Sequence, residues 1–544
     1  MKSKFAIMVN GSDLQYWQIQ TVEHLLQTGK TELAAIIVNT NSRAIPLARS
    51  LNELIFSLYR RSLRIPLLRK CSISAMFPAT PRLLMNPEET SKWRDTFSNS
   101  DLEVLRELNL DFALRFGYGI LDGEILDVPR HGIWSFHHGD EAKYRGRPPG
   151  FWEVYRSERT SGAILQRLTS KLDGGLILKK GVFRTKKNSY RGNLEMLLSA
   201  GIEWPSQVLA ELGSSRFKQS GEKLGYLYKL PNPVELIRFN LALVWRNWVS
   251  LLRKMFLHPA WEIHIFESNI DAVALAEKFP EQASSTIVPE AQRFYADPVL
   301  LNNHLLFEDF DYRSGNGKIV VIELEQEKPQ LDVVLGETDK HFSYPYVVSQ
   351  GDETYMIPEQ SDQGEVSLYK FRDLELRQVE IVATLIDEPL IDSSVVYHKG
   401  LWFLFASPAG DGSETYLNLY YSKRLDGQFV PHPLNPVKID VRSSRPGGSF
   451  FEFGGALHRV AQDCSIEYGG GVAINRIDVL SKWDFAETTV NTVGPHGKCR
   501  FGYGLHTITS ANGKVAIDVK KYRFSLMTLL FKVRRKVLGR LNLA

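Results

Sequence analysis

The sequence predicts a multidomain protein, with an α/β domain over residues 1–213 and an all-β, five-bladed propeller over residues 261–525. In the first part, apolar segments alternate with amphipathic ones, which is typical of a parallel sheet covered by helices on both faces. After about residue 261, short strands and tight turns take over, and similar hairpins recur about every 50 residues. A chain of 544 residues is also too long for one hydrophobic core.

The α/β pattern is clearest between residues 5 and 140. Its apolar runs end in polar residues or glycine, whereas the segments between them have helical spacing. The predicted elements are strand 5–10, helix 14–29, strand 32–40, helix 86–109, strand 110–118 and strand 132–140. Because ligands bind beyond the carboxyl ends of the strands in such sheets, the loop after the last strand is a candidate site.

That loop lies in the stretch GIWSFHHGDEAKYRGRPPGFWE, residues 132–153. It places His137, His138 and Asp140 within four positions and adds two tryptophans, more than a core or a turn requires. The composition indicates a loop that leaves a strand and closes over a ligand. Strand alternation predicts that His138 faces away from His137.

The all-β part contains five hairpins that can be laid over one another. Their turns centre on Asn303, Gly351, Gly400, Gly454 and Gly513. One strand–turn–strand unit per repeat of about 50 residues is typical of a propeller blade, so the pattern predicts five blades.

Two helical segments flank the propeller: a connector over residues 214–260 and a basic amphipathic helix over residues 526–544. Arg238, Arg246 and Arg253 lie within about 80° of one another on the connector. Each segment has two interpretations. It is either a helix docked on a domain with its cations in solvent, or a peripheral contact with an anionic membrane.

Composition favours a soluble, cytoplasmic protein. The net charge of +4 gives no reason to expect a nucleic-acid partner, and eight basic residues without an acidic one lie in residues 520–544. Cys71, Cys464 and Cys499 lack metal-ligand spacing, so we expect no disulfide framework and no metal site. The first apolar run is too short for a signal peptide, and no apolar stretch reaches the ~18 residues that span a bilayer.

Four short motifs follow one another in the α/β domain: Ser135-Phe136-His137, Tyr144-Arg145-Gly146, Ser161-Gly162 and Asp173-Gly174-Gly175. In this order the segment resembles the folate-dependent formyltransferases, the family of methionyl-tRNA and glycinamide ribonucleotide formyltransferases. The resemblance covers roughly residues 1–213. It implies a Rossmann-like formyltransferase domain that uses 10-formyltetrahydrofolate as the formyl donor.

The resemblance also implies roles for individual residues. His137 would handle the proton and stabilise the oxyanion, and Asp173 would orient it. The asparagine of the family falls on Ser135, so either Ser135 or a neighbour such as His138 replaces it, or the domain is weakened or inactive. Arg145 is expected to bind substrate. The expected folate-binding residues are Phe116, Gly117, Tyr118, Gly119, Ile120 and Leu121.

The second part resembles a five-bladed propeller shared by arabinanase-like glycoside hydrolases and the N-terminal part of plant glucosamine inositolphosphorylceramide transferases. The segments FYADPVLLNNHLLFEDFDY, HPLNPV, SRPGGSFF and HRVAQDCSIEYGGGVAINRI carry this resemblance. It implies an axial pocket that binds carbohydrate. The expected substrate-binding residues there are Asp297, Glu359, Asp392 and Arg445. Aspartates at blade starts also cap strands, and the set of carboxylates is incomplete, so hydrolysis stays open.

Together these resemblances predict an enzyme that moves a formyl group to an amine of a sugar, nucleotide sugar or glycolipid precursor, with the propeller holding the carbohydrate. The alternative is a carbohydrate-binding or glycosyl-processing propeller protein whose formyltransferase domain is degenerate, which the serine at position 135 motivates. The sequence gives no information on the oligomeric state.

Overall fold

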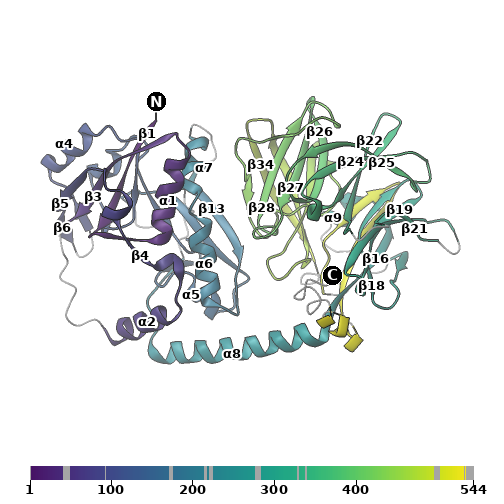
Figure 1. Cartoon of the computed structure of the whole chain (residues 1–544), viewed down its shortest axis with the longest axis horizontal. Helices are drawn as coiled ribbons and strands as arrows, with labels where there is room; N and C mark the ends of the chain where they lie inside the picture. Colours follow the sequence, from purple (N-terminus) through teal and green to yellow (C-terminus); the bar gives the residue numbers. More distant parts are fainter. Residues whose placement is uncertain are drawn as a thin grey trace. The chain divides into compact units, whose positions relative to one another are not determined.

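The computed structural model describes residues 2–40, 50–91, 94–170, 175–212, 217–219, 225–275, 283–326, 330–336, 340–494, 503–527, 529–531 and 533–534. The chain divides into two compact units, Met1–Asn247 and Trp248–Ala544 (Figure 1). The first unit is α/β and the second is a five-bladed, all-β propeller, which confirms the predicted fold class.

The described residues of the first unit contain an eight-stranded sheet in the order β14-β13-β12-β10-β8-β1-β3-β5. The strands are β1 (Ser3–Asn10), β3 (Thr31–Asn39), β5 (Arg82–Met85), β8 (Phe112–Arg115), β10 (Ile133–His137), β12 (Thr160–Arg167), β13 (Leu176–Arg184) and β14 (Lys218–Gln219). The run from β5 to β10 is parallel, whereas β12, β13 and β14 are antiparallel. The expectation of a wholly parallel sheet is therefore wrong at one edge.

Helices and short ladders surround this sheet. The helices are α1 (Tyr16–Gln27), α2 (Leu51–Ser62), α3 (Ile73–Met76), α4 (Asn99–Glu107), α5 (Phe151–Tyr155), α6 (Tyr190–Ala200) and α7 (Trp204–Glu211). The short strands are β2 (Asp13–Gln15), β4 (Lys70–Ser72), β6 (Glu88–Ser91), β7 (Arg94–Thr96), β9 (Ile120–Leu121), β11 (Tyr144–Gly146) and β15 (Tyr226–Tyr228).

The predicted helix over residues 86–109 is wrong in its first half. Glu88–Ser91 and Arg94–Thr96 pair with each other as β6 and β7, and β7 also pairs with β9. The helix α4 begins only after Ser98, whose side chain accepts a hydrogen bond from the backbone N–H of Asp101. The N-cap at Ser98 sets the start of α4, although the residues before it also have helical spacing. This explains why the helix is shorter than predicted.

The described residues of the second unit form five antiparallel sheets of four strands in a row, one of them with an added strand (Figure 1). The first four blades are β18–β21 (Arg293–Leu335), β22–β25 (Ser343–Ile386), β26–β29 (Leu390–Pro431) with β30 (Lys438–Ile439), and β31–β34 (Phe451–Val493). The fifth combines β35 (Ile508–Ala511) and β36 (Lys514–Phe524) with β16 (Leu257–Glu267) and β17 (Ser285–Ile287). Because β16 pairs with β36 along its length, the first and last strands of the propeller close the ring.

The predicted hairpins coincide with blade strands. Asn303 and Gly351 lie in the turns β18 (Arg293–Leu301)–β19 (His304–Asp311) and β22 (Ser343–Gln350)–β23 (Glu353–Glu359). The other three turns join β26 (Leu390–His398) to β27 (Leu401–Pro408), β31 (Phe451–Phe453) to β32 (Ala456–Gln462), and β35 to β36. The remaining blade strands are β20 (Asn316–Glu323), β21 (Asp332–Leu335), β24 (Val366–Phe371), β25 (Val379–Ile386), β28 (Tyr416–Ser422), β29 (Val430–Pro431), β33 (Val472–Leu480) and β34 (Phe485–Val493).

A strained residue recurs in three consecutive blades. Asp297, Tyr344 and Asp392 have φ values of 51°, 44° and 52°, in β18, β22 and β26, and each lies at a register shift of its strand. Non-glycine residues in this left-handed region are strained by roughly 1–2 kcal/mol and often mark functional sites. The strain thus singles out equivalent positions in three blades.

Helix α8 (Pro233–Phe256) accounts for most of the predicted connector. Helix α9 (Ile270–Ala274) follows β16, and the described part of residues 526–534 is helical. The rest of the predicted C-terminal helix lies outside the described residues. Among the described helices, none combines the length and the apolarity that a bilayer crossing requires.

Candidate functional site

The strand β10 sends its side chains to two sides of the sheet. Ser135 and His137 alternate with Phe136 and His138. The rings of Phe136 and His138 both pack edge-on against Trp17 of α1. His138 therefore faces away from His137, as predicted, and burial lowers its pKa to about 3. This histidine stays neutral at physiological pH and packs in the helical layer.

His137 ends β10 at the carboxyl edge of the parallel strands. Its Nε2 lies 3.1 Å from the carbonyl oxygen of Tyr144. A carbonyl only accepts hydrogen bonds, so Nε2 carries the proton and donates it, and Nδ1 is left as the nitrogen that can accept one. The loop from Gly139 to Tyr144 thus fixes the tautomer of His137.

Ser135 is buried and has an arginine partner that the sequence did not indicate. The Nε of Arg115, the last residue of β8, donates to Ser135 Oγ at 3.2 Å. Its Nη1 donates to the carbonyl of Gly119. The Ser135 oxygen therefore accepts a hydrogen bond from the guanidinium, and its own O–H can still donate a hydrogen bond to another group. A cation thus lies beside the position where the formyltransferases have asparagine.

The predicted folate segment, Phe116–Leu121, uses its own backbone within the fold. The N–H groups of Phe116 and Gly117 donate to Met8, and those of Tyr118 and Gly119 donate to the side chains of Asn10 and Asp95. The side chains of Tyr118 and Leu121 lie in the core, Phe116 stacks on Phe136, and Ile120 pairs with Arg94 in a ladder. The segment therefore forms a rigid wall whose N–H groups are already bonded.

A cavity of about 460 Å³ lies directly beyond this segment. It is lined by Asp122, Gly123, Leu126, Asp127, Arg167, Leu168, Thr169, Ser170 and Leu176. Its volume falls within the ~300–1,000 Å³ range of small-molecule sites. Asp173 lies outside the described residues, but Ser170 and Leu176, which flank its segment, both line this cavity.

Arg145 lies in β11, next to the residue that receives the hydrogen bond of His137. The strand β11 pairs in parallel with β15, opposite Leu227. The Tyr144 hydroxyl donates to Glu158 at 2.8 Å, which anchors this strand. The structure therefore places Arg145 on the same loop that fixes His137.

In the propeller, the predicted Asp297 belongs to a buried triad that includes two residues the sequence did not indicate. His506 Nε2 lies 3.1 Å from Asp297 Oδ1, and its Nδ1 lies 2.8 Å from Asp518 Oδ2. Burial lowers the pKa of His506, but the charges of Asp518 and Asp297 outweigh burial and raise it to about 10. Because an imidazolium does not bind metal, we interpret this cluster as a charge-compensated triad, although its three ligand atoms lie within 4.8 Å of one another.

The triad predicts how stability depends on pH. In the folded protein the pKa of His506 is about 10, above its ordinary value of 6.5. The stabilisation that its protonation provides is therefore fully present below pH 6.5 and is lost as the pH rises towards 10. We expect the free energy of unfolding of the full chain to fall across this window by at most ~1.4 kcal/mol per pH unit for one proton. Denaturant titrations followed by tryptophan fluorescence, to which the neighbouring Trp261 contributes, measure this slope.

The variant His506→Gln provides the control, because it should be less stable than the wild type and should show a flatter slope. Any slope that remains comes from the other titrating groups of the chain. A wild-type stability that rises between pH 6.5 and 10 would contradict the protonated triad.

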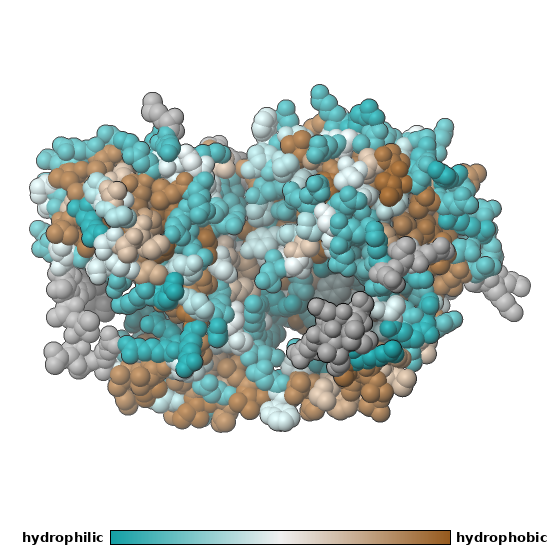
Figure 2. Space-filling model, viewed as in Figure 1, coloured by the Kyte–Doolittle hydropathy of each residue, from teal (hydrophilic) through white to brown (hydrophobic). Residues whose placement is uncertain are grey.

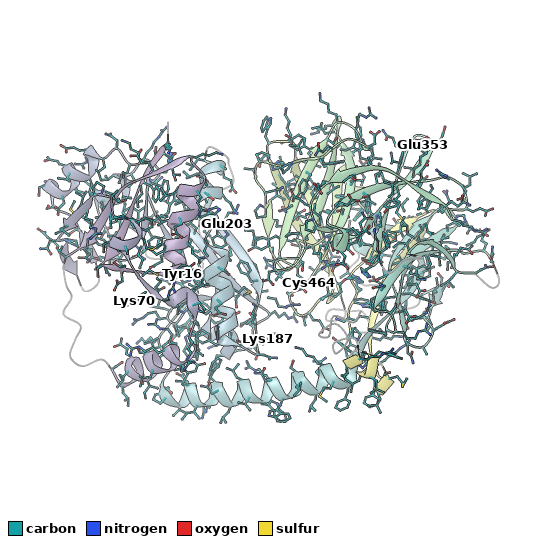
Figure 3. All side chains as sticks on the ribbon, viewed as in Figure 1. Tyr16, Lys70, Lys187, Glu203, Glu353 and Cys464 are labelled. Carbon is teal, nitrogen blue, oxygen red and sulfur yellow. The ribbon has the colours of Figure 1, made fainter. Side chains whose placement is uncertain are left out.

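The predicted Asp392 and Arg445 form a buried ion pair. Arg445 Nε donates to Asp392 Oδ2 at 2.5 Å, and Gln462 Nε2 donates to the same oxygen at 2.8 Å. The Arg445 guanidinium lies 4.8 Å from the ring centre of Tyr468. Burial raises the pKa of Asp392, Arg445 lowers it, and it settles at about 6. The side chain of Cys464, which Figure 3 labels, is also buried in this unit, and its Sγ lies 4.0 Å from Oε1 of Gln462.

Glu359 lies near another buried carboxyl, that of Glu308, which the sequence did not indicate. His341 Nε2 lies 3.9 Å from a carboxyl oxygen of each. Burial and the charge of Asp297 raise the pKa of Glu308 well above its ordinary range. A cavity of about 550 Å³ adjoins His341 and is lined by Lys340, His341, Asp362, Gln363 and Glu365.

Arg115, Glu308, His506 and Asp518 are thus the site residues that sequence reasoning missed. All but His506 share one signal, a charged residue inside an apolar strand run such as FALR, LLFEDF or VAIDV. Such a residue must find a partner to be buried. His506 carries no comparable signal.

Comparisons with known proteins divide along the two units. Residues 254–502 match a family model described as "Glucosamine inositolphosphorylceramide transferase 1, N-terminal". The chain is 39% identical over 156 residues to glucosamine inositolphosphorylceramide transferase 1 of Oryza sativa subsp. japonica, which is 28% of this chain and only 21% of that protein. The chain thus spans about a fifth of the length of this plant relative.

Methionyl-tRNA formyltransferases also match the chain. The chain is 31% identical over 245 residues to the methionyl-tRNA formyltransferase of Clostridium botulinum, which is 43% of this chain and 77% of that protein. Among solved structures, glycinamide ribonucleotide transformylase 1 from Symbiobacterium toebii is 14% identical, with a TM-score of 0.29 over 42% of this chain and 95% of that one.

Proposed function

The chain belongs to the methionyl-tRNA formyltransferase family, and from this premise we propose that it moves a formyl group from 10-formyltetrahydrofolate to an amine of a sugar, nucleotide sugar or glycolipid precursor. The observation that carries the proposal is the group of His137, Ser135 and Arg115 at the carboxyl edge of the parallel strands. This group combines a base with donors for an oxyanion, and acyl transfer needs both.

In the proposed reaction, the uncharged amine nitrogen attacks the formyl carbon, and the carbonyl electrons move to oxygen. His137 Nδ1 accepts the amine proton, because Nε2 is held by Tyr144. The Ser135 hydroxyl donates to the oxyanion, and the Arg115 guanidinium stabilises the negative charge beside it. The bond from the formyl carbon to the folate nitrogen then breaks, and that nitrogen takes the proton from His137.

We place the formyl donor in the cavity beyond Leu121 and not against the predicted segment Phe116–Leu121. The N–H groups of Phe116 to Gly119 are already bonded, whereas Gly123 and Leu126 line open space. We therefore shift the proposed folate contacts from Phe116–Leu121 towards Asp122–Asp127. Asp173 keeps its proposed orienting role on the strength of the family motif Asp173-Gly174-Gly175.

The propeller is proposed to hold the carbohydrate part of the acceptor. Asp297, Asp392 and Arg445 are linked electrostatically: besides burial, which raises the pKa of both carboxyls, the charge of Arg445 lowers the pKa of both, and the charge of Asp297 raises the pKa of Asp392. Carboxylates, an arginine and the ring of Tyr468 match what sugar hydroxyls and an amino group need. The plant relative is named as a glucosamine inositolphosphorylceramide transferase, and glucosamine is an amino sugar, which supports an amino sugar as the acceptor.

The test is a transfer assay with the full chain, 10-formyltetrahydrofolate and a panel of amino-sugar nucleotides. Mass spectrometry of the sugar and release of tetrahydrofolate give two independent readouts. Binding of a stable folate analogue is measured in parallel. Analogue binding without transfer to any amine would favour the alternative, a propeller protein with a degenerate formyltransferase domain.

The hydroxyl of Ser135 has its own prediction. Ser135→Ala removes one oxyanion donor and leaves Arg115 in place, so turnover should fall ~10²-fold, the scale of losing one such donor. The affinity for the folate analogue should stay within a few-fold. Unchanged turnover would move the donor role to Arg115, and a gain of activity in Ser135→Asn would support the degenerate-domain alternative.

A further inference from the structure

Helix α8 has two apolar sides, and only one of them is covered. Leu236 and Phe239 are buried in a core cluster of the first unit together with Phe56 and Phe151. On the same side of the helix, Arg246 donates to the backbone carbonyls of Val154 and Lys187. These contacts attach the first half of α8 to the unit and leave its other face outward.

The outward face of α8 is also apolar. At 100° per residue, its exposed large side chains lie within an arc of about 160°. They are Val234, Ile237, Leu241, Val244, Trp245, Trp248, Val249, Leu251, Leu252 and Met255. Trp245 and Trp248 are 70% and 59% exposed. In Figure 2 brown, hydrophobic atoms lie along α8. A continuous apolar strip of this length is unusual on a soluble surface and marks an interaction site.

Basic residues border this strip. Arg238, Arg253 and Lys254 are exposed on its flanks, whereas Glu235 is the one acidic residue of the helix and is occupied by the backbone N–H of Asn232. Tryptophans with flanking cations are characteristic of a helix that lies in the headgroup region of a bilayer. A second copy of the chain would bring equal positive flanks together, whereas anionic headgroups neutralise them.

Each unit adds a further exposed apolar segment. In the first unit, α2 exposes Leu51, Leu54 and Leu58 on one side and buries Phe56 on the other. In the second unit, Phe524 stacks on Phe256 at the end of α8, with ring centres 5.9 Å apart. The chain continues from there with exposed apolar residues: Leu526, Met527, Leu530 and Val533. Exposed apolar residues are thus found on α2 in the first unit and after Phe524 in the second, in addition to those of α8.

We propose that the outward face of α8 binds the surface of an anionic lipid bilayer, with the helix axis parallel to the membrane plane and Trp245 and Trp248 inserted among the headgroups. The connector is then a membrane-contacting element, which is one of the two interpretations that its sequence left open. The proposal does not depend on formyl transfer, because it rests on the surface of α8 alone.

The experiment is flotation of the full chain with phosphatidylcholine vesicles that contain or lack phosphatidylglycerol. We expect binding to the anionic vesicles at low salt and release at high salt. Trp245→Glu/Trp248→Glu should weaken binding at least ~100-fold, because both apolar anchors become repelled charges. The matched control is Trp483→Glu, which changes a tryptophan that is 66% exposed in a propeller turn and should bind like the wild type.

Circular dichroism and thermal unfolding verify that both variants fold, which we expect because the changed side chains are exposed. Equal binding of the double variant and the wild type, or no binding by the wild type, would overturn the proposal. Light scattering tests the competing occupant. A wild-type dimer that the double variant converts to a monomer would assign this face to a second copy of the chain instead.

Discussion

Replacing His137 by alanine is expected to lower formyl transfer by ~10³–10⁴-fold, because one side chain supplies both the proton acceptor and the positive charge that the transition state needs. The affinity for a stable folate analogue should change only a few-fold. A group that acts mainly in the transition state lowers kcat without weakening the binding of the ground state.

The matched control is His131→Ala. His131 precedes the same strand at its amino end, so it lies a strand length away from His137. Its backbone carbonyl, and not its ring, accepts the hydrogen bond of Trp134. This variant should keep wild-type turnover. If His137→Ala retained more than a tenth of the wild-type rate, the base would have to be sought in another residue.

A pH profile separates a chemical role from a structural one. Since only an unprotonated Nδ1 can accept the proton of the amine, kcat/KM of the wild type should rise with pH and then level off. The residual activity of His137→Ala should lack this limb. A merely misfolded variant would instead lose activity at all pH values together with its affinity for the folate analogue.

The strand that carries Ser135 and His137 could be predicted from the sequence because its motif is local. Ser135 and His137 are two positions apart, so strand alternation alone puts them on one face. Arg115 escaped prediction because it reaches Ser135 only when β8 and β10 lie side by side, across 20 residues of chain. Which residues make such contacts depends on which strands pair. A charged residue at the end of an apolar run indicates only that it has a polar partner somewhere in the fold.

The same limit applies to the fold. The five hairpins were visible because each is closed by a short turn, whereas the pairing of Leu257 with Phe524 joins the two ends of the propeller. The antiparallel edge of the first sheet was also missed. The strands β12 and β13 pair antiparallel, and the sequence between Arg167 and Leu176 is too short for the crossover helix of a parallel pair. The apolar pattern of a buried strand does not itself show the strand's direction.

Replacing Arg445 by leucine is expected to lower the free energy of unfolding by ~3–5 kcal/mol at neutral pH, because it leaves the buried carboxylate of Asp392 without its cation. The pKa of Asp392 is about 6 with Arg445 present and should rise further in the variant. A carboxyl whose folded pKa is raised destabilises the protein increasingly as the pH rises above its ordinary value of 3.8, so the deficit should grow with pH. Denaturant titrations at several pH values measure it.

The double variant Asp392→Asn/Arg445→Leu should recover most of this loss. Asparagine removes the charge, can still accept the hydrogen bond of Gln462, and tolerates the φ of 52° at this position better than an apolar residue does. A double variant no more stable than Arg445→Leu alone would refute the account of an uncompensated charge. If the pair also holds the acceptor sugar, calorimetry should find the stable double variant unable to bind it, which separates recognition of the sugar from stability of the propeller.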